Sequence, residues 1–443
     1  MFSNKDLRKL IIPLVIEQLL AVTIGMADTV MVSSCGEAAV SGISLVDSIN
    51  FLLITLFSSL ATGGAVIASQ YIGRGDHKSA SLAAKQLFYA SLALSAVLGV
   101  IAVFFRKPVL NMVFGSIEAD VMAHAQIYFL LSAISYPFLA VYNAGAALFR
   151  SMGDSRTTML ISILMNTINI VGNAILIYGF QMAAAGAATA SLVSRAVGAI
   201  IITVLLLNPR RIIFYDKLHK PEIHLSMLKS ILQIGVPNGL ENSIFQIGKI
   251  LVASIVSGFG TISITANAVA GNLASLQVIP GMALGMAMIT VVGQCIGAKD
   301  YEAVKKYTKK LMLITYGVVW AMTLLMLLFS KQILSFYSLS EETTTMTMEV
   351  FIVHGICAVI VWPLAFALPN ALRAANDVRF TMIVSLLSMW IFRIGFSYVL
   401  AIYFNMGILG TWIAMCIDWF CRGACFVIRF VRGKWKNISF IDN

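Results

Sequence analysis

Twelve long apolar runs, separated by short segments that contain most of the charged residues, make up most of this 443-residue sequence. Each run supplies about the 20 apolar residues that a helix needs to cross a hydrocarbon core of roughly 30 Å. The pattern therefore predicts a polytopic membrane protein with twelve transmembrane helices. The predicted spans are residues 10–33, 48–70, 86–105, 127–149, 157–180, 183–207, 231–258, 268–296, 311–330, 346–370, 380–404 and 407–431.

The apolar character of each run is continuous, which favours helices over a membrane barrel. A barrel would alternate apolar and polar residues in segments of about ten. The first run begins a few residues into the chain, is long, and is not followed by a small-residue cleavage site. We therefore expect it to be a retained helix and not a signal peptide.

The chain repeats itself at a displacement of 224 residues. The matched stretches are IIPLVIEQ (11–18) with GVPNGLEN (235–242), ASQYIGRGD (68–76) with VGQCIGAKD (292–300) and, at a displacement of 223, RSMGDSR (150–156) with RAANDVR (373–379). Apolar identities would be common in such a sequence, but coinciding Pro, Glu, Gln, Gly and Asp residues are not. The sequence therefore predicts two homologous halves.

The repeat divides the chain into an N-terminal six-helix lobe (1–207), a basic cytoplasmic linker (208–228) and a C-terminal six-helix lobe (229–443). Because six is an even number, both lobes enter the membrane in the same sense, and a pseudo-twofold axis along the membrane normal should relate them. Transporters built from such parallel repeats enclose a cavity between the lobes and open it alternately to each side. We expect the same arrangement here.

The distribution of charged residues predicts which side of the membrane the loops and termini face. Apolar residues account for 59% of the sequence and charged residues for 12%, and the formal net charge of +11 is spread over many short loops. Of the 31 basic residues, 24 lie before the first span or after the even-numbered ones, whereas only Arg106, Lys107 and Lys331 lie on the alternate side. This asymmetry predicts cytoplasmic N- and C-termini. It does not suggest a nucleic-acid-binding face.

Several classes of chemistry are not supported by the sequence. The six cysteines form no CxxC pair, and the five histidines form no cluster at metal-ligand spacing, so neither a metal site nor an intramembrane enzyme is expected. The glycine-containing elements QYIGRG and QCIGAK match neither GxGxxG nor GxxxxGK[ST], so no ATP site is expected. Transport would therefore be driven by an ion gradient, without a cofactor.

Four stretches resemble the MATE (multidrug and toxic compound extrusion) family over essentially the whole chain. They are PLVIEQLL with GMADTVMVS, GGAVIASQYIGRGD, ALFRSMGDSRTTM and IPGMALGMAMITVVGQCIGAKDYEA. The resemblance implies a twelve-helix antiporter that exports organic, often cationic, compounds in exchange for H⁺ or Na⁺.

Asp28 is the main candidate for ion coupling. A charged side chain deep in a span costs about 2.5 to 3.5 kcal/mol on insertion scales, so those that persist usually face the bundle interior or a cavity. The resemblance assigns cation or proton binding to an acidic residue in a D-x-x-[FM] position of the first helix, which here reads DTVM. A carboxylate in a partly dry pocket can exchange a proton, and with oxygen neighbours it can instead hold Na⁺. The structural alternative is a hydrated residue near the helix end.

Glu17 and its repeat mate Glu241 are further ion-coupling candidates. Glu17 precedes Asp28 by eleven residues, which puts both on one helix face about 16 Å apart. The alternative for Glu17 is an ion pair with an arginine. In one branch of the family a functional glutamate lies about a turn beyond Glu241, where this chain has Phe245. Because Asp28 aligns with Val252, the asymmetry favours the first lobe as the main coupling site.

The remaining candidates would line the central cavity. These are Gln18, Asn166, Asn169, Asn173, Asn242, Phe245 and Lys249. The asparagines of the fifth span favour helix-to-helix hydrogen bonds, but amides that face Asp28 could also orient a proton or ligate a cation. The other charged residues within spans are interpreted mainly as internal ion pairs or snorkelling side chains. They are Arg195, Arg393, Asp418 and Arg422.

The sequence thus predicts a monomeric, secondary-active multidrug antiporter of the plasma membrane of a bacterium. Its expected substrates are small organic cations or drugs, and its other partner is membrane lipid. The alternative is a flippase or exporter of a lipid-linked saccharide, which would need more arginine and lysine at the lobe interface to hold a pyrophosphate.

Overall fold

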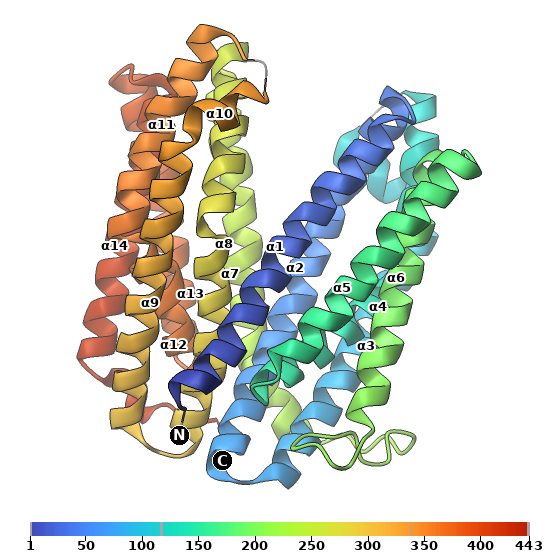
Figure 1. Cartoon of the computed structure of the whole chain (residues 1–443), viewed down its shortest axis with the longest axis vertical. Coiled ribbons are helices and arrows are strands. Elements are labelled where there is room, and N and C mark those ends of the chain that lie inside the picture. Colours follow the sequence, from blue (N-terminus) through green and yellow to red (C-terminus); the bar gives the residue numbers. More distant parts are fainter. Residues whose placement is uncertain (1, 116–117, 338, 441–443) are drawn as a thin grey trace. The chain divides into compact units, whose positions relative to one another are not determined.

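The computed structural model describes residues 2–115, 118–337 and 339–440, and every regular element in these ranges is a helix (Figure 1). Eleven of the described helical segments are long and apolar enough to cross a membrane, and the 30-residue α1 is a further long helix. The prediction of an all-helical, multi-span membrane protein is confirmed. The cytoplasmic location of the termini stays a prediction.

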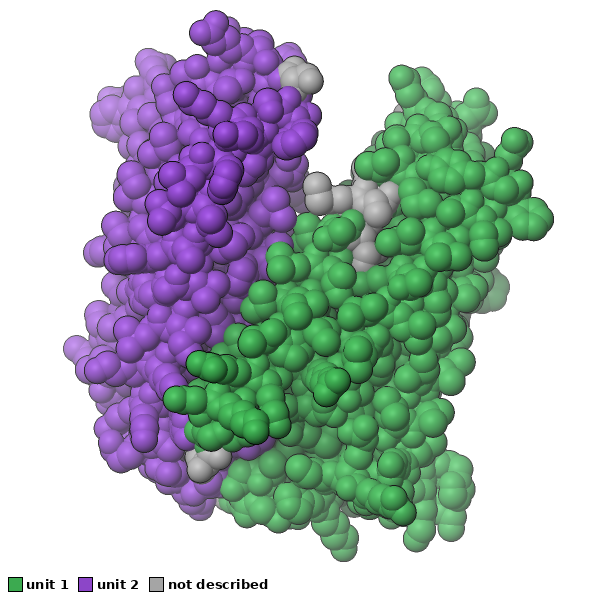
Figure 2. All heavy atoms as spheres, in the orientation of Figure 1, with its two compact units in different colours: residues 1–239 green, residues 240–443 purple. Residues whose placement is uncertain are grey.

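Two compact units make up the chain, residues 1–239 and 240–443 (Figure 2). The division falls inside helix α7, which carries the chain from one unit into the next. Residues 208–224 contain turns and irregular backbone but no helix. They are tied to the first unit, because Gln86 Nε2 donates to the Glu222 carbonyl at 2.7 Å and the Tyr89 hydroxyl donates to the Leu218 carbonyl at 2.8 Å. The lobe and linker bounds drawn from the repeat stay a prediction.

The first unit is built around α4, which packs against α2, α3 and α6, while α1 packs against α5. Close approach of α2 and α4 depends on Gly42, since a Cβ there would lie 2.9 Å from the Ala125 nitrogen. The helices are α1 (Asn4–Ser33), α2 (Glu37–Arg74), α3 (His77–Phe114), α4 (Ala119–Ser151), α5 (Ser155–Asn173), the π-helical η1 (Ala174–Gly179), α6 (Ala183–Leu206) and the start of α7 (Leu225–Ser257).

The second unit is less regular, because its later spans are interrupted by π-helical turns. Pro363 lacks a backbone N–H and cannot continue α11, which ends at Ile360. After α7 the elements are α8 (Thr261–Gly297), α9 (Tyr301–Leu328), α10 (Ser330–Ser335), α11 (Glu341–Ile360), η2 (Pro363–Ala367), α12 (Leu368–Ala374), α13 (Val378–Ser388), η3 (Met389–Gly395), η4 (Tyr398–Tyr403), α14 (Gly407–Val431) and the 3₁₀ turn η5 (Lys434–Asn437).

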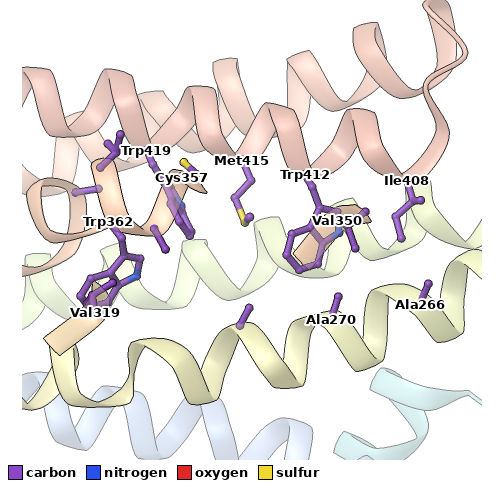
Figure 3. Close-up of a cluster of buried hydrophobic side chains, with 14 of the residues drawn as sticks. Ala266, Ala270, Val319, Val350, Cys357, Trp362, Ile408, Trp412, Met415 and Trp419 are labelled. Atoms are coloured by element: carbon purple, nitrogen blue, oxygen red, sulfur yellow. The ribbon is translucent and has the colours of Figure 1, made fainter. Parts of the chain in front are cut away.

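A tryptophan-rich apolar core holds the second unit together. Trp412, Met415 and Trp419 project from α14, and Ala266 and Ala270 of α8 line the same cluster (Figure 3). Small alanines on α8 leave room for the large indole rings, so the helices can pack closely. Phe366 packs against this core, and the centres of the Phe366 and Trp419 rings are 5.3 Å apart.

The repeated Gly-Asp and Lys-Asp elements form tight turns between consecutive helices. In the first unit α2 ends at Arg74 and is capped by Gly75, with φ +81°. Asp76 then accepts a hydrogen bond from the Ser79 nitrogen at 2.9 Å as the N-cap of α3. In the second unit Lys299, with φ +56°, precedes Asp300, which caps α9 in the same way. Hydrogen bonds from Ser79 hold the pKa of Asp76 below its usual range. The sequence repeat therefore encodes a repeated helix-capping turn.

Gly75→Ala should destabilise the protein by about 1 kcal/mol, because a Cβ at positive φ is strained although no atom lies within 4 Å of it. Gly317→Ala is the matched control. Gly317 lies inside α9, also with no atom near its Cβ position, so there alanine should stabilise the helix by about 0.5 kcal/mol. Thermal unfolding in detergent measures both, and effects of the same sign would contradict this account.

Candidate functional site

Asp28 is held by an asparagine of α5. Asn173 is fully buried, and its Nδ2 donates to Asp28 Oδ1 at 2.5 Å, while the Asp28 side chain itself is half-buried. The contact is possible because α1 packs directly against α5. Asp28 is therefore not a passive residue surrounded by water, but one end of a defined contact between two helices.

A chain of polar side chains continues from Asn173 into α6. Its Nδ2 lies 3.5 Å from Asn169 Oδ1, and Asn169 Nδ2 donates to the Ser191 hydroxyl at 3.1 Å. Asn169 and Asn173 are four residues apart and thus on one helix face. Asn166, which shares a face with Asn173 by its spacing of seven, makes no hydrogen bond through its buried Nδ2 to any described group.

One acceptor in this chain lacks a donor. Asn173 Oδ1 is buried and has no hydrogen-bond partner among the described groups. A buried carbonyl oxygen without a donor costs about 1 to 3 kcal/mol. This oxygen and the Asp28 carboxylate are of the type that a hard cation prefers as ligands. The residues present therefore fit Na⁺, and the carboxylate alone fits H⁺.

A second carboxylate, Asp47 of α2, belongs to the same unit. It accepts hydrogen bonds from the Tyr128 hydroxyl at 3.1 Å and from Asn50 Nδ2 at 3.3 Å, and Asn50 in turn accepts from the Tyr136 hydroxyl at 2.8 Å. The sequence does not single out this residue, because the second apolar run begins at residue 48, one position after it. The sequence feature that could have indicated Asp47 is its position as an acidic residue three positions before Asn50.

Arg195 of α6 acts on both carboxylates without forming an ion pair within 4.0 Å in the part of the chain that the structure describes. Its Nη1 donates to the Ser135 hydroxyl at 2.7 Å, and it interacts electrostatically with Asp28 and Asp47. Two carboxylates and one guanidinium give this group a formal charge of −1 when all are ionised. The group defined by Asp28, Asp47, Asn169, Asn173 and Arg195 is called the Asp28 group below.

Glu17 and Glu241 each form an ion pair with an arginine, and the sequence repeat aligns the two pairs with each other. Glu17 pairs with Arg150 at 3.2 Å, and Glu241 pairs with Arg373 at 2.8 Å. A hydroxyl supports each pair, Thr158 at 2.8 Å from Glu17 and Ser385 at 2.7 Å from Glu241. The ion-pair alternative for Glu17 thus describes its surroundings in this structure, and both pairs are largely buried.

The other predicted cavity residues are distributed over α1 and α7. Gln18 and Asn242 are half-buried beside their glutamates. Phe245 is half-buried, whereas Lys249, one turn further, is exposed and its Nζ lies 5.2 Å from the centre of the Phe245 ring. Asp418 pairs with Arg422 at 3.1 Å and lies 4.0 Å from Arg393.

Among the residues that the structure describes, no group of three or more His, Cys, Asp and Glu side chains is arranged to hold a metal ion. The buried His354 hydrogen-bonds through Nδ1 to Gln277 Oε1 at 2.8 Å, and Gln277 donates to the Thr323 hydroxyl. This histidine is therefore part of the packing between α8, α9 and α11.

A family model described as MatE matches the chain twice, over residues 13–175 and 237–399. Both bounds of the second match are displaced by 224 residues from those of the first, which is the displacement that relates the two halves of the sequence.

The chain is also similar to curated proteins over nearly its whole length. It is 26% identical to the "Uncharacterized transporter YisQ" of Bacillus subtilis, with 96% of this chain and 93% of that protein covered. It is 26% identical to the "Probable multidrug resistance protein NorM" of Thermotoga maritima (98% and 93% covered) and 29% identical to the protein of the same description from Bacillus cereus (96% and 95%).

Solved structures share the fold. A structure described as MATE in the bent conformation superposes with a TM-score of 0.88 at 20% identity, covering 97% of this chain and 94% of that one. A multidrug resistance MATE family transporter in an outward-facing conformation also gives 0.88, at 21% identity with 97% and 95% covered. At these identities the likeness establishes the fold alone.

Proposed function

Because the chain belongs to the MatE family, we propose that it is an ion-coupled antiporter that exports organic compounds in exchange for H⁺ or Na⁺, with Asp28 as the coupling residue. Membership makes the chain a multi-span transporter of the bacterial plasma membrane and not an enzyme, as the sequence predicted. Two relatives that match over nearly their whole length are described as probable multidrug resistance proteins, which favours this function over the flippase alternative.

The observation that carries the proposal is the contact between Asp28 and Asn173, whose own carbonyl oxygen has no donor. An antiporter needs a site that alternately takes up and releases its coupling ion. A half-buried carboxylate beside an unsatisfied acceptor oxygen gains from the arrival of either H⁺ or Na⁺, because each neutralises charge in a partly dry site.

The formal charges of the Asp28 group allow the coupling ion both to bind and to leave. The Asp28 group carries two carboxylates against one guanidinium, so binding of one cation brings its formal charge from −1 to zero. Arg195 lowers the affinity for that cation without occupying the carboxylate, since it makes its own hydrogen bond to Ser135. Departure of the ion restores the negative charge of the Asp28 group. If two conformations of the protein differ in their stability with this charge, binding and release of the ion shift the equilibrium between them.

The test uses purified protein in liposomes with a fluorescent cationic dye, and imposes a pH gradient and a Na⁺ gradient separately. The proposal predicts that at least one gradient drives the dye against its own concentration gradient, and that collapsing that gradient stops the flux. Equal dye movement with and without both gradients would overturn it. The comparison also identifies the coupling ion.

A further inference from the structure

In the second unit, three cationic side chains lie close to the aromatic ring of Phe245. The Phe245 ring of α7 has Lys249 Nζ at 5.2 Å, Arg422 Cζ at 5.4 Å and Arg393 Cζ at 5.6 Å from its centre. Each of these distances is within the range of a cation–π contact. These residues and Asp418 are called the Phe245 cluster below.

The cluster has an excess of positive charge. Asp418, which is fully buried, pairs with Arg422 and more loosely with Arg393, and it also accepts a hydrogen bond from the Ser388 hydroxyl. Among the described residues no other carboxylate lies within 4.0 Å of the three cations. Three cations and one carboxylate leave a formal charge of +2, which is costly for a membrane-embedded group unless an anion offsets it.

Hydrogen-bond donors in the cluster are also unused. Arg422 is 2% exposed, and its Nε, like the Nε of Arg393, is buried without a hydrogen-bond partner among the described groups. Lys249 makes no ion pair within the described part of the chain and is exposed, so its ammonium group can be reached from outside the unit. An accessible ammonium and unsatisfied guanidinium donors around one aromatic ring are an arrangement that suits a carboxylate.

Aromatic walls accompany these charges. Phe366 contacts Phe245 edge-to-face at 6.1 Å and lies 5.3 Å from Arg422. Phe366 belongs to the π-helical η2 and Arg393 to the π-helical η3, and such turns inside helices occur frequently at functional sites. The rings provide flat apolar surface beside the cations, which favours a ligand that combines an aromatic frame with an anionic group.

The two units differ in the sign of their membrane-embedded charge. The Asp28 group of the first unit is formally −1, whereas the Phe245 cluster of the second is +2, and the glutamate–arginine pair in each unit is neutral. A cation would therefore be bound in the first unit and an anion in the second.

We propose that the Phe245 cluster binds an aromatic carboxylate, and that the substrates of this transporter include organic anions as well as cations. The claim that the bound compound is also a transported substrate rests on the proposed function. Binding itself requires no ion gradient, so it can be tested independently of coupling.

Dansylglycine and its methyl ester are a suitable probe pair, since they differ in one negative charge. Their fluorescence on titration with the purified full-length protein gives both dissociation constants. We expect dansylglycine to bind at least about tenfold more tightly than the ester, because one charge-assisted contact is worth roughly that factor. Equal binding of the two probes, or binding of neither, would overturn the proposal.

Lys249→Met tests the same site with little risk to folding, because the side chain is exposed. It should weaken dansylglycine binding about tenfold and leave the ester unchanged, whereas Lys249→Arg keeps the positive charge and should bind dansylglycine more tightly than Lys249→Met. The exposed Lys331 serves as control, and Lys331→Met should bind both probes as the wild type does. If Lys249→Met weakens acid and ester alike, the cluster does not recognise the carboxylate. Asp28→Asn should keep dansylglycine binding, which distinguishes failure of this inference from failure of ion coupling.

Discussion

Asp28→Asn is expected to reduce ion-driven export by at least about tenfold, to the level of passive leak. Asparagine has nearly the same shape and can still contact Asn173, but it can neither carry a proton nor offset the charge of Na⁺. Dye flux in liposomes under the effective gradient measures the change. Because the substitution leaves the packing of α1 against α5 intact, expression and the unfolding temperature should be retained.

Asp120→Asn is the matched control for this substitution. Asp120 is an exposed carboxylate in the first turn of α4, with no contact to the Asp28 group, so its variant should transport as the wild type does. Gradient-driven flux at the wild-type rate in Asp28→Asn would exclude Asp28 from coupling. A loss of flux in both variants would instead point to a general effect of removing a carboxylate.

Glu241→Gln is expected to destabilise the protein by about 3 kcal/mol. Removing the negative partner leaves Arg373, whose side chain is 11% exposed, as an uncompensated buried charge. Glu17→Gln should have a similar effect in the first unit, since Arg150 is 18% exposed and pairs with Glu17 at 3.2 Å. Thermal or denaturant unfolding in detergent measures both losses.

The double variant Glu241→Gln/Arg373→Met separates a structural pair from two independent residues. With the buried positive charge gone, it should recover most of the stability that Glu241→Gln loses, so the two effects will not add. Additive losses would show that Glu241 and Arg373 do not act as a pair. Ion-driven transport in the folded double variant should be retained if the pair is structural.

Much of the fold could be predicted from the sequence, because twenty-residue apolar runs leave few alternatives in a membrane. The duplicated Pro-x-x-x-Glu and Gln-x-x-Gly elements also indicated two halves. The π-helical turns could not be predicted. The run 346–370 contains Pro363 and was expected as one span, but the proline divides it into α11, η2 and α12. Hydropathy reports burial in lipid and does not report how the backbone hydrogen bonds are arranged within a span.

Some members of the Asp28 group are also candidates from the sequence alone. Asp28 could be singled out as a carboxylate deep in an apolar run, and Asn169 and Asn173 by their place in the fifth span. Which of the asparagines contacts Asp28 depends on how α1 and α5 pack, and spacing along one helix cannot supply that. Asp47 was missed because it lies at the edge of an apolar run, where a charge is unremarkable until Tyr128 and Asn50 are seen to bind it.

The arginine partners of the two glutamates illustrate the same limit. Arg150 and Arg373 were assigned to loops after spans, although the repeat matched them to each other at a displacement of 223 residues. Their long side chains reach back to Glu17 and Glu241 from the ends of α4 and α12. A matched acid and a matched base in each half were therefore visible in the sequence as a repeated pair.

The most direct test of the central claim compares gradient-driven dye flux in liposomes for the wild type, Asp28→Asn and Lys249→Met. If coupling is carried by the Asp28 group of the first unit, only Asp28→Asn will lose the response to the ion gradient. Lys249→Met will keep that response for a cationic dye. A full response to the gradient in Asp28→Asn would contradict the account.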